Sequence, residues 1–212
     1  MRDLQKSLWV WNLNEGELPN LISLCKRKQI DKVYLNYLID IDLNELAKNG
    51  IEYSCLIGDS KNELNAQEII QIAKKAFLRG FKRVHLDIEY SGTETKESYY
   101  LKLREAVSTI KWIGIPIEFD IECWNNDKEY LKIQKIPNEL ALMSYAKTVK
   151  GTIKRAGFFR FKPFLVGIET NPEYEAAMSL DKVDKAIEEL NRYYRWNPFY
   201  RGVAIHCWGF YK

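Results

Sequence analysis

Short apolar runs alternate with amphipathic stretches along the whole chain, at intervals of roughly 25 residues. Eight of the runs have the length of strands, and each except the last is followed by a helical stretch or a short excursion. Strands that alternate with helices in this way form parallel sheets. We therefore expect an α/β protein with one domain over residues 1–212, a compact (β/α)8 TIM barrel with short loops. The expected strands cover residues 8–12, 32–37, 51–57, 83–89, 116–123, 140–145, 164–169 and 203–208, and the expected helices cover residues 19–29, 42–48, 65–79, 95–112, 128–133, 149–156 and 181–195.

An open, doubly wound sheet is the alternative arrangement of the same elements. Such folds often carry a glycine-rich phosphate loop after the first strand, whereas this chain has Trp11-Asn12-Leu13-Asn14 there. The chain also has no linker-like shift in composition that would mark a second domain. The barrel is therefore the favoured prediction, and its loops must be short because the chain is short for that fold.

The composition is that of an ordinary globular protein, with 46% hydrophobic and 29% charged residues and a net charge of +3. The 32 basic residues are mixed with 29 acidic ones, so no basic block indicates a nucleic-acid partner. No apolar run reaches the length of a membrane span, and residues 1–7 leave no room for a secretory signal. We therefore expect a cytoplasmic protein without a membrane partner. The sequence leaves the oligomeric state open.

Aromatic residues make up 13% of the chain, with six Trp and thirteen Tyr. They either fill the interior of a small barrel or line a cleft in which their faces stack on sugar rings. Two of them, Trp112 and Trp196, lie in or after helices and are expected in the core. The cysteines lie far apart without a CxxC pair, so we expect small buried thiols rather than disulfides or a zinc site. They are Cys25, Cys55, Cys123 and Cys207.

The segment 84–89, Val-His-Leu-Asp-Ile-Glu, combines strand-forming residues with three ionisable groups. Alternate side chains of a strand share a face, so the apolar side chains point one way and the ionisable ones point the other. The ionisable residues are His85, Asp87 and Glu89. A central parallel strand is covered on both faces, and burying three ionisable groups there without a purpose costs too much free energy. The pattern indicates carboxylate chemistry at the carboxyl end of a barrel strand.

Polar and aromatic side chains also collect at the carboxyl ends of the other expected strands, where barrel enzymes place their catalytic groups. The opposite ends begin mostly with Lys, Arg or Pro. This asymmetry favours an enzyme over an inert scaffold. The residues at the carboxyl ends are Trp11, Asn12, Asn36, Tyr37, Asp59, Asp87, Glu89, Asp120, Glu122, Tyr145, Glu169, His206 and Trp208.

Glu89 is the first candidate for a general acid/base. Burial and the like charge of Asp87 would raise the pKa of its carboxyl, which keeps a proton available for a leaving oxygen near neutral pH. A salt-bridged barrel residue without a catalytic role is the alternative. On the next strand, we expect the deeper Glu118 to pair with a Lys or Arg. Glu122 at the mouth would bind substrate or serve as the base of an inverting mechanism.

The segment Leu86-Asp87-Ile88-Glu89 resembles the end of the DxxDxDxE strand of family 18 glycoside hydrolases, the chitinase-like barrels. Met143-Ser144-Tyr145 is similar to the MxY of their sixth strand, and Trp208 falls where that family places a Trp beneath the sugar. Of the family's motif residues, this chain therefore retains the last two carboxylates, Asp87 and Glu89, together with Tyr145 and Trp208. Where the family has the first Asp, the Gly and the middle Asp of the motif and an Asp after the MxY, this chain has Lys82, Arg83, His85 and Ala146.

Further short sequence motifs are similar to those of small, uncharacterised bacterial glycosidase-like barrels. They are spread over most of the chain and fall at residues 56–59, 86–89, 143–145, 166–170 and 204–206. Together, the resemblances imply a glycoside hydrolase that cleaves a glycan containing an amino sugar or a related unit, without a cofactor. The expected partner is therefore a carbohydrate or oligosaccharide.

Two catalytic arrangements fit, and they differ in the partner of Glu89. In the chitinase-like scheme, which the resemblance implies, Asp87 and Tyr145 hold a substrate N-acetyl group that attacks its own anomeric carbon. In the two-carboxylate scheme, Glu169 at the end of the seventh strand is the nucleophile of a retaining reaction. The first is favoured, because Asp87 is adjacent and Tyr145 matches the family motif.

Two other functions remain open. One is a carbohydrate-binding barrel that has lost catalysis, and the other is a hydrolase with a metal held by His85, Asp87, Glu122 and His206. No HxH or HxxxH spacing supports that metal, so we expect none, and the two histidines are expected to be neutral hydrogen-bond partners of the carboxylates. The expected substrate-binding residues are Trp208, Trp11, Asn36, Asp59, Glu122, Trp124 and His206.

Overall fold

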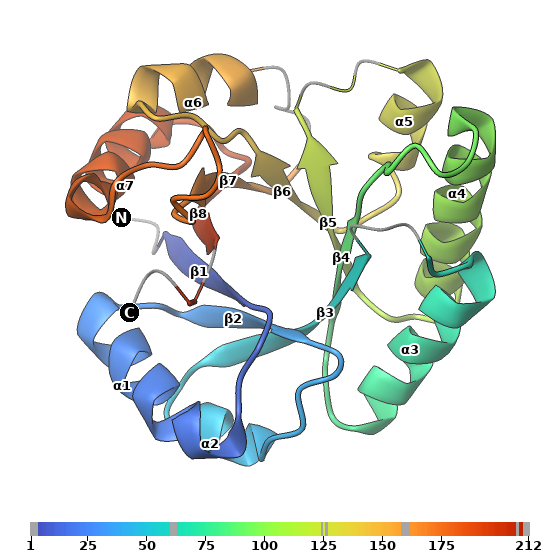
Figure 1. Ribbon diagram of the computed structural model, residues 1–212, viewed down its shortest axis with the longest axis horizontal. Coiled ribbons are helices and arrows are strands. Elements are labelled where there is room, and N and C mark those ends of the chain that lie inside the picture. The colour runs from blue at the N-terminus through green and yellow to red at the C-terminus, as the bar shows by residue number, and fades with distance from the viewer. Residues whose placement is uncertain are drawn as a thin grey trace.

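The computed structural model is a closed barrel of eight parallel strands surrounded by helices (Figure 1). The structure describes residues 4–59, 63–123, 125, 127–157, 162–206 and 208–209, without the side chains of Glu15 and Asp59. Each strand pairs in parallel with the next, and β8 closes the ring against β1. The expected single (β/α)8 barrel is confirmed, and the doubly wound sheet is excluded. Within the described residues, no helix is both long and apolar enough to cross a membrane.

The elements follow one another in the expected order. The strands are β1 Gln5–Val10, β2 Lys32–Asn36, β3 Glu52–Asp59, β4 Val84–Ile88, β5 Ile117–Glu122, β6 Glu139–Met143, β7 Phe164–Glu169 and β8 Tyr200–His206. The helices are η1 Glu15–Glu17, α1 Leu18–Lys28, α2 Leu43–Lys48, α3 Ala66–Leu78, α4 Lys96–Trp112, α5 Lys128–Ile133, α6 Val149–Ala156 and α7 Leu180–Tyr194.

Local sequence explains where the helices begin. Asn65 and Glu68 form a reciprocal capping box at the start of α3, and Thr95 accepts a hydrogen bond from the Ser98 amide at the start of α4. Asp42, Asp127 and Thr148 cap α2, α5 and α6 in the same way. These caps satisfy amides that have no partner within the helix, so each of these five helices has a defined starting point, whereas α1 and α7 begin without a side-chain cap.

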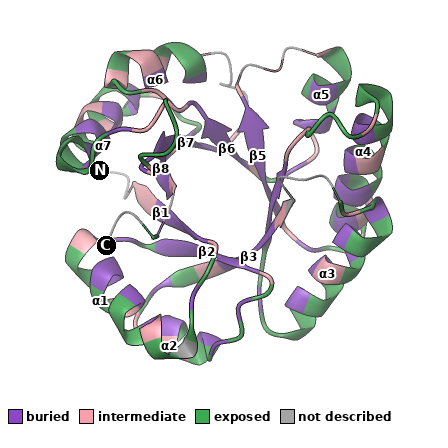
Figure 2. Cartoon of the chain, viewed as in Figure 1, coloured by how far each residue is buried: buried purple, intermediate pink, exposed green. Residues whose placement is uncertain are grey.

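Two separate apolar regions hold the barrel together. The larger one lies between the strands and the helices, where Figure 2 shows buried inner helix faces and exposed outer ones. The smaller one lies inside the barrel and consists of Trp9, Tyr34, Leu56, Ala141, Leu165 and Ala204, with Trp11 packed against it. Barrel interiors are usually filled with branched apolar side chains. Here the apolar lumen cluster is small, and buried polar groups occupy much of the remaining interior.

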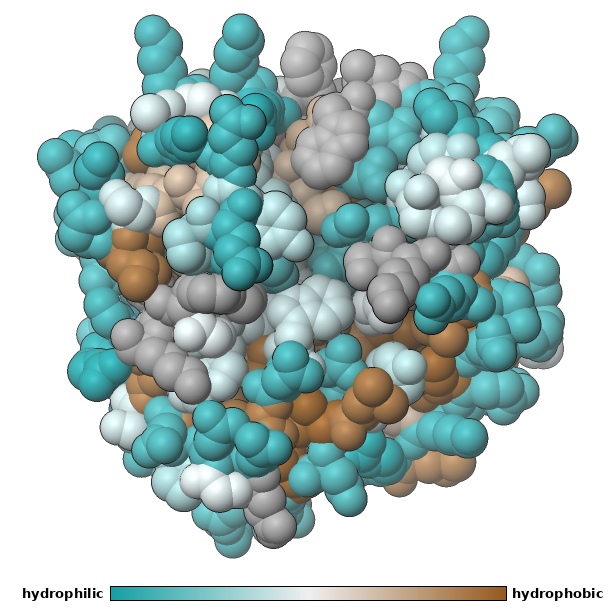
Figure 3. Space-filling model, viewed as in Figure 1, coloured by the Kyte–Doolittle hydropathy of each residue, from teal (hydrophilic) through white to brown (hydrophobic). Residues whose placement is uncertain are grey.

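The outer surface is largely hydrophilic in the view of Figure 3, as the mixed charge of the sequence requires. Two residues depart from the sequence prediction. Trp112 and Trp196, expected in the core, are 85% and 82% exposed because they follow the last buried turns of α4 and α7. Isolated exposed apolar residues of this kind are common on globular proteins. Cys25 and Cys55 are buried free thiols, Cys123 is a partly buried free thiol, and Cys207 lies outside the described residues.

The main errors of the sequence prediction are at the two strands that close the barrel. β1 begins and ends earlier than expected, so Trp11 and Asn12 follow the strand. β8 begins at Tyr200 and ends at His206, so Trp208 lies beyond it. The pairing between β8 and the neighbouring strand β7 shifts in register between Phe164 and Leu165 of β7, beside the start of β8. β8 has one extra residue at this point, and the pattern of apolar residues in the sequence does not show it.

Gly202 makes the irregularity possible. Its φ of +140° is rarely adopted by residues with a side chain, and an added Cβ would lie 1.8 Å from the carbonyl oxygen of Gln5 on β1. We expect Gly202→Ala to lower the free energy of unfolding by about 3 kcal/mol, because it adds both backbone strain and an overlap. Gly16→Ala is the control, since its Cβ meets nothing within 4 Å. Chemical denaturation should give a lower unfolding midpoint for Gly202→Ala than for Gly16→Ala. Equal midpoints would show that residue 202 does not require a glycine.

Candidate active site

The inward faces of β4 and β5 form a column of ionisable side chains that runs along the barrel axis. His85 pairs in register with Glu118, and the strand alternation places Asp87 and Asp120 one step higher on the same faces. All four side chains are buried, with exposures of 0% for His85, 7% for Asp87, 1% for Glu118 and 3% for Asp120. Glu122 and Glu89 stand above them near the mouth. The predicted alternation of segment 84–89 therefore holds.

An ion pair forms the floor of this column. The buried Lys32 ammonium on β2 contacts Glu118, and Arg83 lies 3.5 Å from the same carboxylate. The ammonium also lies 5.2 Å from the centre of the Tyr34 ring. Burial alone would raise the pKa of Glu118, but Lys32 and His85 lower it to about 2. The expected pairing of Glu118 with a basic residue is confirmed.

His85 occupies the centre of the lumen. Its ring stacks on Tyr34 at a centroid distance of 3.9 Å, and its Nε2 atom lies 2.9 Å from Asp120 Oδ2. Burial alone would lower the pKa of His85, but Asp120 and Glu118 raise it to about 9. The ring is therefore charged at neutral pH, contrary to the neutral state expected from the sequence. In the charged ring Nε2 carries a proton that it donates to Asp120, so it cannot also accept a hydrogen bond from Trp9 Nε1, which lies 3.1 Å away.

The mouth above His85 is acidic. Burial and the charges of Asp120 and Glu89 raise the pKa of Asp87 well above its usual range. Burial, Glu122 and Asp120 raise the pKa of Glu89, which His206 partly opposes. Glu122 accepts hydrogen bonds from the Tyr90 amide and the Asn125 side chain, at 3.4 Å and 3.2 Å. Carboxyl groups are thus concentrated on β4 and β5, and two of them retain protons more readily than in water.

The opposite side of the mouth is built from β7, β8 and the end of β1. His206 Nδ1 lies 2.7 Å from Glu169 Oε2, and Trp11 Nε1 donates to His206 Nε2 at 2.7 Å. Since Nε2 accepts, the proton of His206 lies on Nδ1 and is donated to Glu169. The other oxygen of Glu169 accepts a hydrogen bond of 2.7 Å from the Asn171 amide. Both oxygens of Glu169 are therefore held, and its exposure is 3%.

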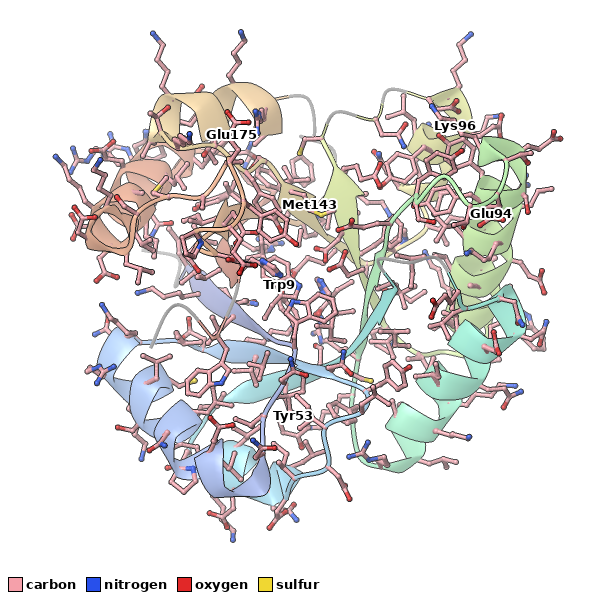
Figure 4. All side chains as sticks on the ribbon, in the orientation of Figure 1. Trp9, Tyr53, Glu94, Lys96, Met143 and Glu175 are labelled. Carbon is pink, nitrogen blue, oxygen red and sulfur yellow. The ribbon has the colours of Figure 1, made fainter. Side chains whose placement is uncertain are left out.

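Aromatic rings surround His206. Trp9, Trp11 and Tyr145 have ring centroids 5.8 Å, 6.0 Å and 6.2 Å from it. Figure 4 shows Trp9 inside the ring of strands. Tyr174, in the loop after β7, adds a fourth ring at 6.4 Å and is 56% exposed. Tyr174 was not predicted from the sequence, because nothing distinguishes a loop tyrosine until the fold places its loop near the mouth.

Tyr145 connects the two sides of the mouth. Its ring lies nearly parallel to His206, with an interplanar angle of 28°. Burial and the nearby Asp120, Asp87, Glu169 and Glu89 raise its pKa well above the usual range. The phenol therefore keeps its proton and can act as a hydrogen-bond donor beside the carboxyl groups.

The remaining predicted substrate-binding residues are only partly brought together. Asn36 is 9% exposed at the end of β2 and accepts a hydrogen bond from the Leu38 amide. Trp208, expected beneath a sugar, is 5% exposed and belongs to the helix-side core. It lines a cleft with α1 residues, which removes it from the barrel mouth. Asp59 ends β3, but its side chain, like the whole of Trp124, lies outside the described residues.

The acidic column does not have the arrangement of a metal site. Among the side chains that the structure describes, no three His, Cys, Asp or Glu residues are placed to hold a metal ion. His85 and His206 are each committed to a carboxylate within the lumen, at 2.9 Å and 2.7 Å. The described carboxyl, imidazole and phenol groups of this mouth can transfer protons and form hydrogen bonds.

Comparisons with known proteins support the fold. No protein-family model and no curated protein sequence matches this chain. Among solved structures, a chitinase from Bacteroides thetaiotaomicron has a TM-score of 0.66 at 10% identity, over 96% of this chain and 89% of that one. A family 18 chitinase from the chitin utilization locus of Flavobacterium johnsoniae has a TM-score of 0.62 at 11% identity, with coverages of 98% and 88%.

A xylanase–amylase inhibitor protein is also similar, with a TM-score of 0.67 at 11% identity over 99% of this chain and 94% of that chain. At such identities the likeness concerns the fold rather than the chemistry. The chain has the barrel fold of these structures, which include chitinases, one of them of family 18, and an inhibitor protein.

The stability of the protein should depend on pH through His85 and Glu118. His85 stabilises the fold fully below pH 6.5, its ordinary pKa, and this contribution is lost as the pH rises through about 9. Glu118 contributes above its ordinary pKa of 4.5, and its contribution is lost as the pH falls through about 2. Asp87 and Glu89 add a loss of stability that begins above their ordinary pKa values of 3.8 and 4.5 and is complete once the pH has passed their raised pKa values.

We therefore expect the free energy of unfolding to fall by an amount on the order of 3 kcal/mol between pH 6.5 and 9. Denaturant titrations of the wild type at several pH values measure this. His85→Gln, which cannot be charged, should be less stable at pH 6.5 but should show a smaller alkaline decline. A wild-type stability that stays level across this range would show that His85 is neutral in the fold.

Gly58 on β3 determines the position of Trp11. A Cβ at residue 58 would lie 2.2 Å from Trp11 Cζ3, so the indole ring occupies the space that a side chain would need. We expect Gly58→Ala to displace the ring, break its hydrogen bond to His206 and destabilise the fold by about 2 kcal/mol. In a Trp11→Ala background the same change should cost much less, because the overlapping ring is absent. Additive effects in this double-mutant cycle would contradict the close contact.

Proposed function

We propose that this barrel is a glycoside hydrolase that cleaves a glycan containing an N-acetylated amino sugar, with Glu89 as general acid/base. The observation that carries the proposal is the carboxyl of Glu89 at the mouth, whose pKa is raised by burial and by Glu122 and Asp120. A carboxylic acid that keeps its proton near neutral pH can donate it to the oxygen of a departing sugar. The chitinase-like fold supports a substrate of this class.

In the proposed reaction, the substrate's acetamido oxygen attacks the anomeric carbon while Glu89 gives its proton to the leaving oxygen. Glu89 then removes a proton from the water that opens the cyclic intermediate. Asp87 and Tyr145 lie beside this position and would hold the acetamido group, as the resemblance of segments 86–89 and 143–145 implies. The raised pKa of Tyr145 supports its role as a donor.

The alternative scheme, with Glu169 as nucleophile, receives less support. A nucleophilic carboxylate needs a free oxygen beside the anomeric carbon. Glu169 gives one oxygen to His206 and the other to the Asn171 amide. We assign Glu169 the role of orienting His206, which in turn fixes Trp11 at the rim.

The aromatic side of the mouth would bind the sugar. Trp11 and the exposed Tyr174 offer ring faces on which the apolar face of a pyranose can stack. Asn36, Glu122 and His206 would donate or accept hydrogen bonds to hydroxyl groups, and Asp59 and Trp124 remain proposed contributors. We leave Trp208 out of this set because it packs on the helix side.

A carbohydrate-binding barrel without catalysis is the second candidate function. Two observations favour it: His85 replaces the middle Asp of the family motif, and the similar solved structures include an inhibitor protein. Both candidates bind glycans, so turnover rather than binding separates them. Chitin-type and peptidoglycan-type oligosaccharides are suitable probes.

Glu89→Gln tests the proposed acid. It preserves the shape of the side chain but removes the proton, so turnover should fall by about 10²–10⁴-fold while oligosaccharide affinity is retained. Stability should stay level or rise slightly, because the charge repulsion with Glu122 and Asp120 is relieved. Glu52→Gln, at the exposed opposite end of β3, is the matched control and should change neither quantity.

The outcomes distinguish the functions. Tight binding without turnover by the wild type would identify the non-catalytic barrel. Turnover that is unchanged in Glu89→Gln would place the acid elsewhere. Turnover that is lost in chelator and restored by a divalent ion would instead support the metal-dependent hydrolase.

A further inference from the structure

The end of the barrel at which the strands begin, which we call the amino-terminal face, lies opposite the mouth. Because all strands run the same way, the helices α1 to α7 end on this face, and each is followed there by a connection to the next strand. The last residues of these helices and the connections contain sixteen Lys or Arg residues and one acid, Asp31. They are residues 26–31, 48–51, 75–83, 111–116, 132–138, 154–157, 162–163 and 192–199.

The connections at the mouth have the opposite charge. Between the ends of the strands and the helices that follow them lie ten Asp or Glu residues and one basic residue, Lys147. The two ends of the barrel therefore differ sharply in charge. The mouth connections counted are residues 11–17, 37–42, 63–65, 89–95, 123–127, 144–148 and 170–179.

Helix dipoles account for part of this difference. Basic residues stabilise the carboxyl ends of helices and acidic residues stabilise the amino ends. Five of the sixteen basic residues also form ion pairs within the molecule, whereas the other eleven form no ion pair with a residue that the structure describes. The five are Lys28, Lys48, Arg79, Arg83 and Lys132.

Exposed apolar side chains lie at the same end. The three most exposed large apolar residues that the structure describes are Leu78, Trp112 and Trp196, with exposures of 86%, 85% and 82%. The first two are the last residues of α3 and α4, and Trp196 lies between α7 and β8. Phe77 and Phe199 beside them are 51% and 38% exposed. Each alone would be ordinary, but helix dipoles do not explain why they gather among basic residues, as they would on a binding surface.

The positions of these residues indicate a broad, flat partner. Figure 1 shows α3 and α4 on one side of the ring and α7 on the other, so a partner that covers both groups must span the barrel. A lipid bilayer has this shape, its interface accommodates Trp and aliphatic side chains, and its acidic headgroups attract Lys and Arg. Nucleic acid would also attract the basic residues but gains little from an aliphatic side chain such as Leu78.

We propose that the amino-terminal face binds the surface of a lipid bilayer that contains acidic phospholipids, with Trp112 and Trp196 in the interface and the basic residues against the headgroups. Such binding needs no spanning helix, because basic and aromatic side chains hold a protein on a membrane surface. The proposal therefore revises the expectation of no membrane partner, which rested on the lack of a membrane-spanning apolar run. The mouth would point away from the bilayer, so the binding does not depend on the proposed function.

Vesicles test the role of charge. The wild type should sediment with vesicles of phosphatidylcholine and phosphatidylglycerol but not with vesicles of phosphatidylcholine alone, and added salt should weaken the binding. Lys82→Gln and Lys135→Gln together should lower the partition coefficient by roughly 30-fold, since each basic residue near an anionic surface contributes about a factor of 5. Lys150→Gln, in the exposed first turn of α6 at the mouth end, is the matched control and should bind as the wild type does.

Tryptophan fluorescence tests the apolar contacts. With vesicles whose acyl chains carry bromine, the emission of Trp112 and Trp196 should be quenched. Changing both residues to Ser should remove this quenching and weaken binding, while the melting temperature stays that of the wild type because both side chains are exposed. Leu38→Ser, at a position 74% exposed in the connection after β2, is the control and should leave quenching and binding unchanged.

Several results would overturn the proposal. They are a lack of vesicle binding, equal binding to vesicles without the acidic lipid, and unchanged binding in the lysine and tryptophan variants. Tighter binding to double-stranded DNA than to the vesicles would assign the face to nucleic acid instead. A mass that rises with concentration in the wild type but not in the tryptophan variant, without vesicle binding, would show that a second copy covers the face. Glycan turnover enters none of these measurements, so a failure of the proposed function leaves them intact.

Discussion

The charged ring of His85 between Asp120 and Glu118 is the interaction on which the interior of this barrel depends. A barrel of eight short strands leaves a narrow lumen that branched apolar side chains usually fill. Here the lumen contains buried carboxylates, and these are stable only because His85 and Lys32 supply hydrogen-bonded positive charge. The stacked Tyr34 ring and the neighbouring Trp9 shield this charge from solvent, so it remains effective in a low dielectric.

This arrangement also explains why the two sides of the mouth differ. The positive charge of His85 lies beside Asp120 and Glu118, one step below the mouth. Among the described residues, no Lys, Arg or His forms an ion pair with Asp87 or Glu89, and His206 opposes the rise in the pKa of Glu89 only in part. Their pKa values rise as a result. On the other side, the two carboxylate oxygens of Glu169 accept hydrogen bonds from His206 Nδ1 and from the Asn171 amide. Proton-bearing groups therefore lie on β4 and β5, whereas β7, β8 and the end of β1 carry the aromatic rings.

The sequence was sufficient for the fold and for the acidic strand, because both follow from periodic patterns. The alternation in segment 84–89 correctly predicted which side chains enter the lumen, and Glu118 has the basic partner expected for it. The charge of His85 was missed, since it depends on Asp120 and Glu118 of the neighbouring strand. Trp208 was misplaced because β8 ends at His206, which pairs with the last residue of β7, and a periodic pattern does not report where a strand ends.

The fold alone does not decide between a glycosidase and a binding protein, since similar barrels include both chitinases and an inhibitor. The lumen gives a stronger argument. A protein that only binds sugar can use a carboxylate at the mouth to accept hydrogen bonds from hydroxyl groups. It has less use for several adjacent carboxyl groups deep in the lumen, where each lowers stability unless it is protonated or paired. It lowers stability to keep four carboxyl groups together here, those of Asp87, Glu89, Asp120 and Glu122. Two of them have raised pKa values and lie at the same mouth as the aromatic rings around His206. The proton transfer to a departing oxygen that we propose for Glu89 would account for this cost.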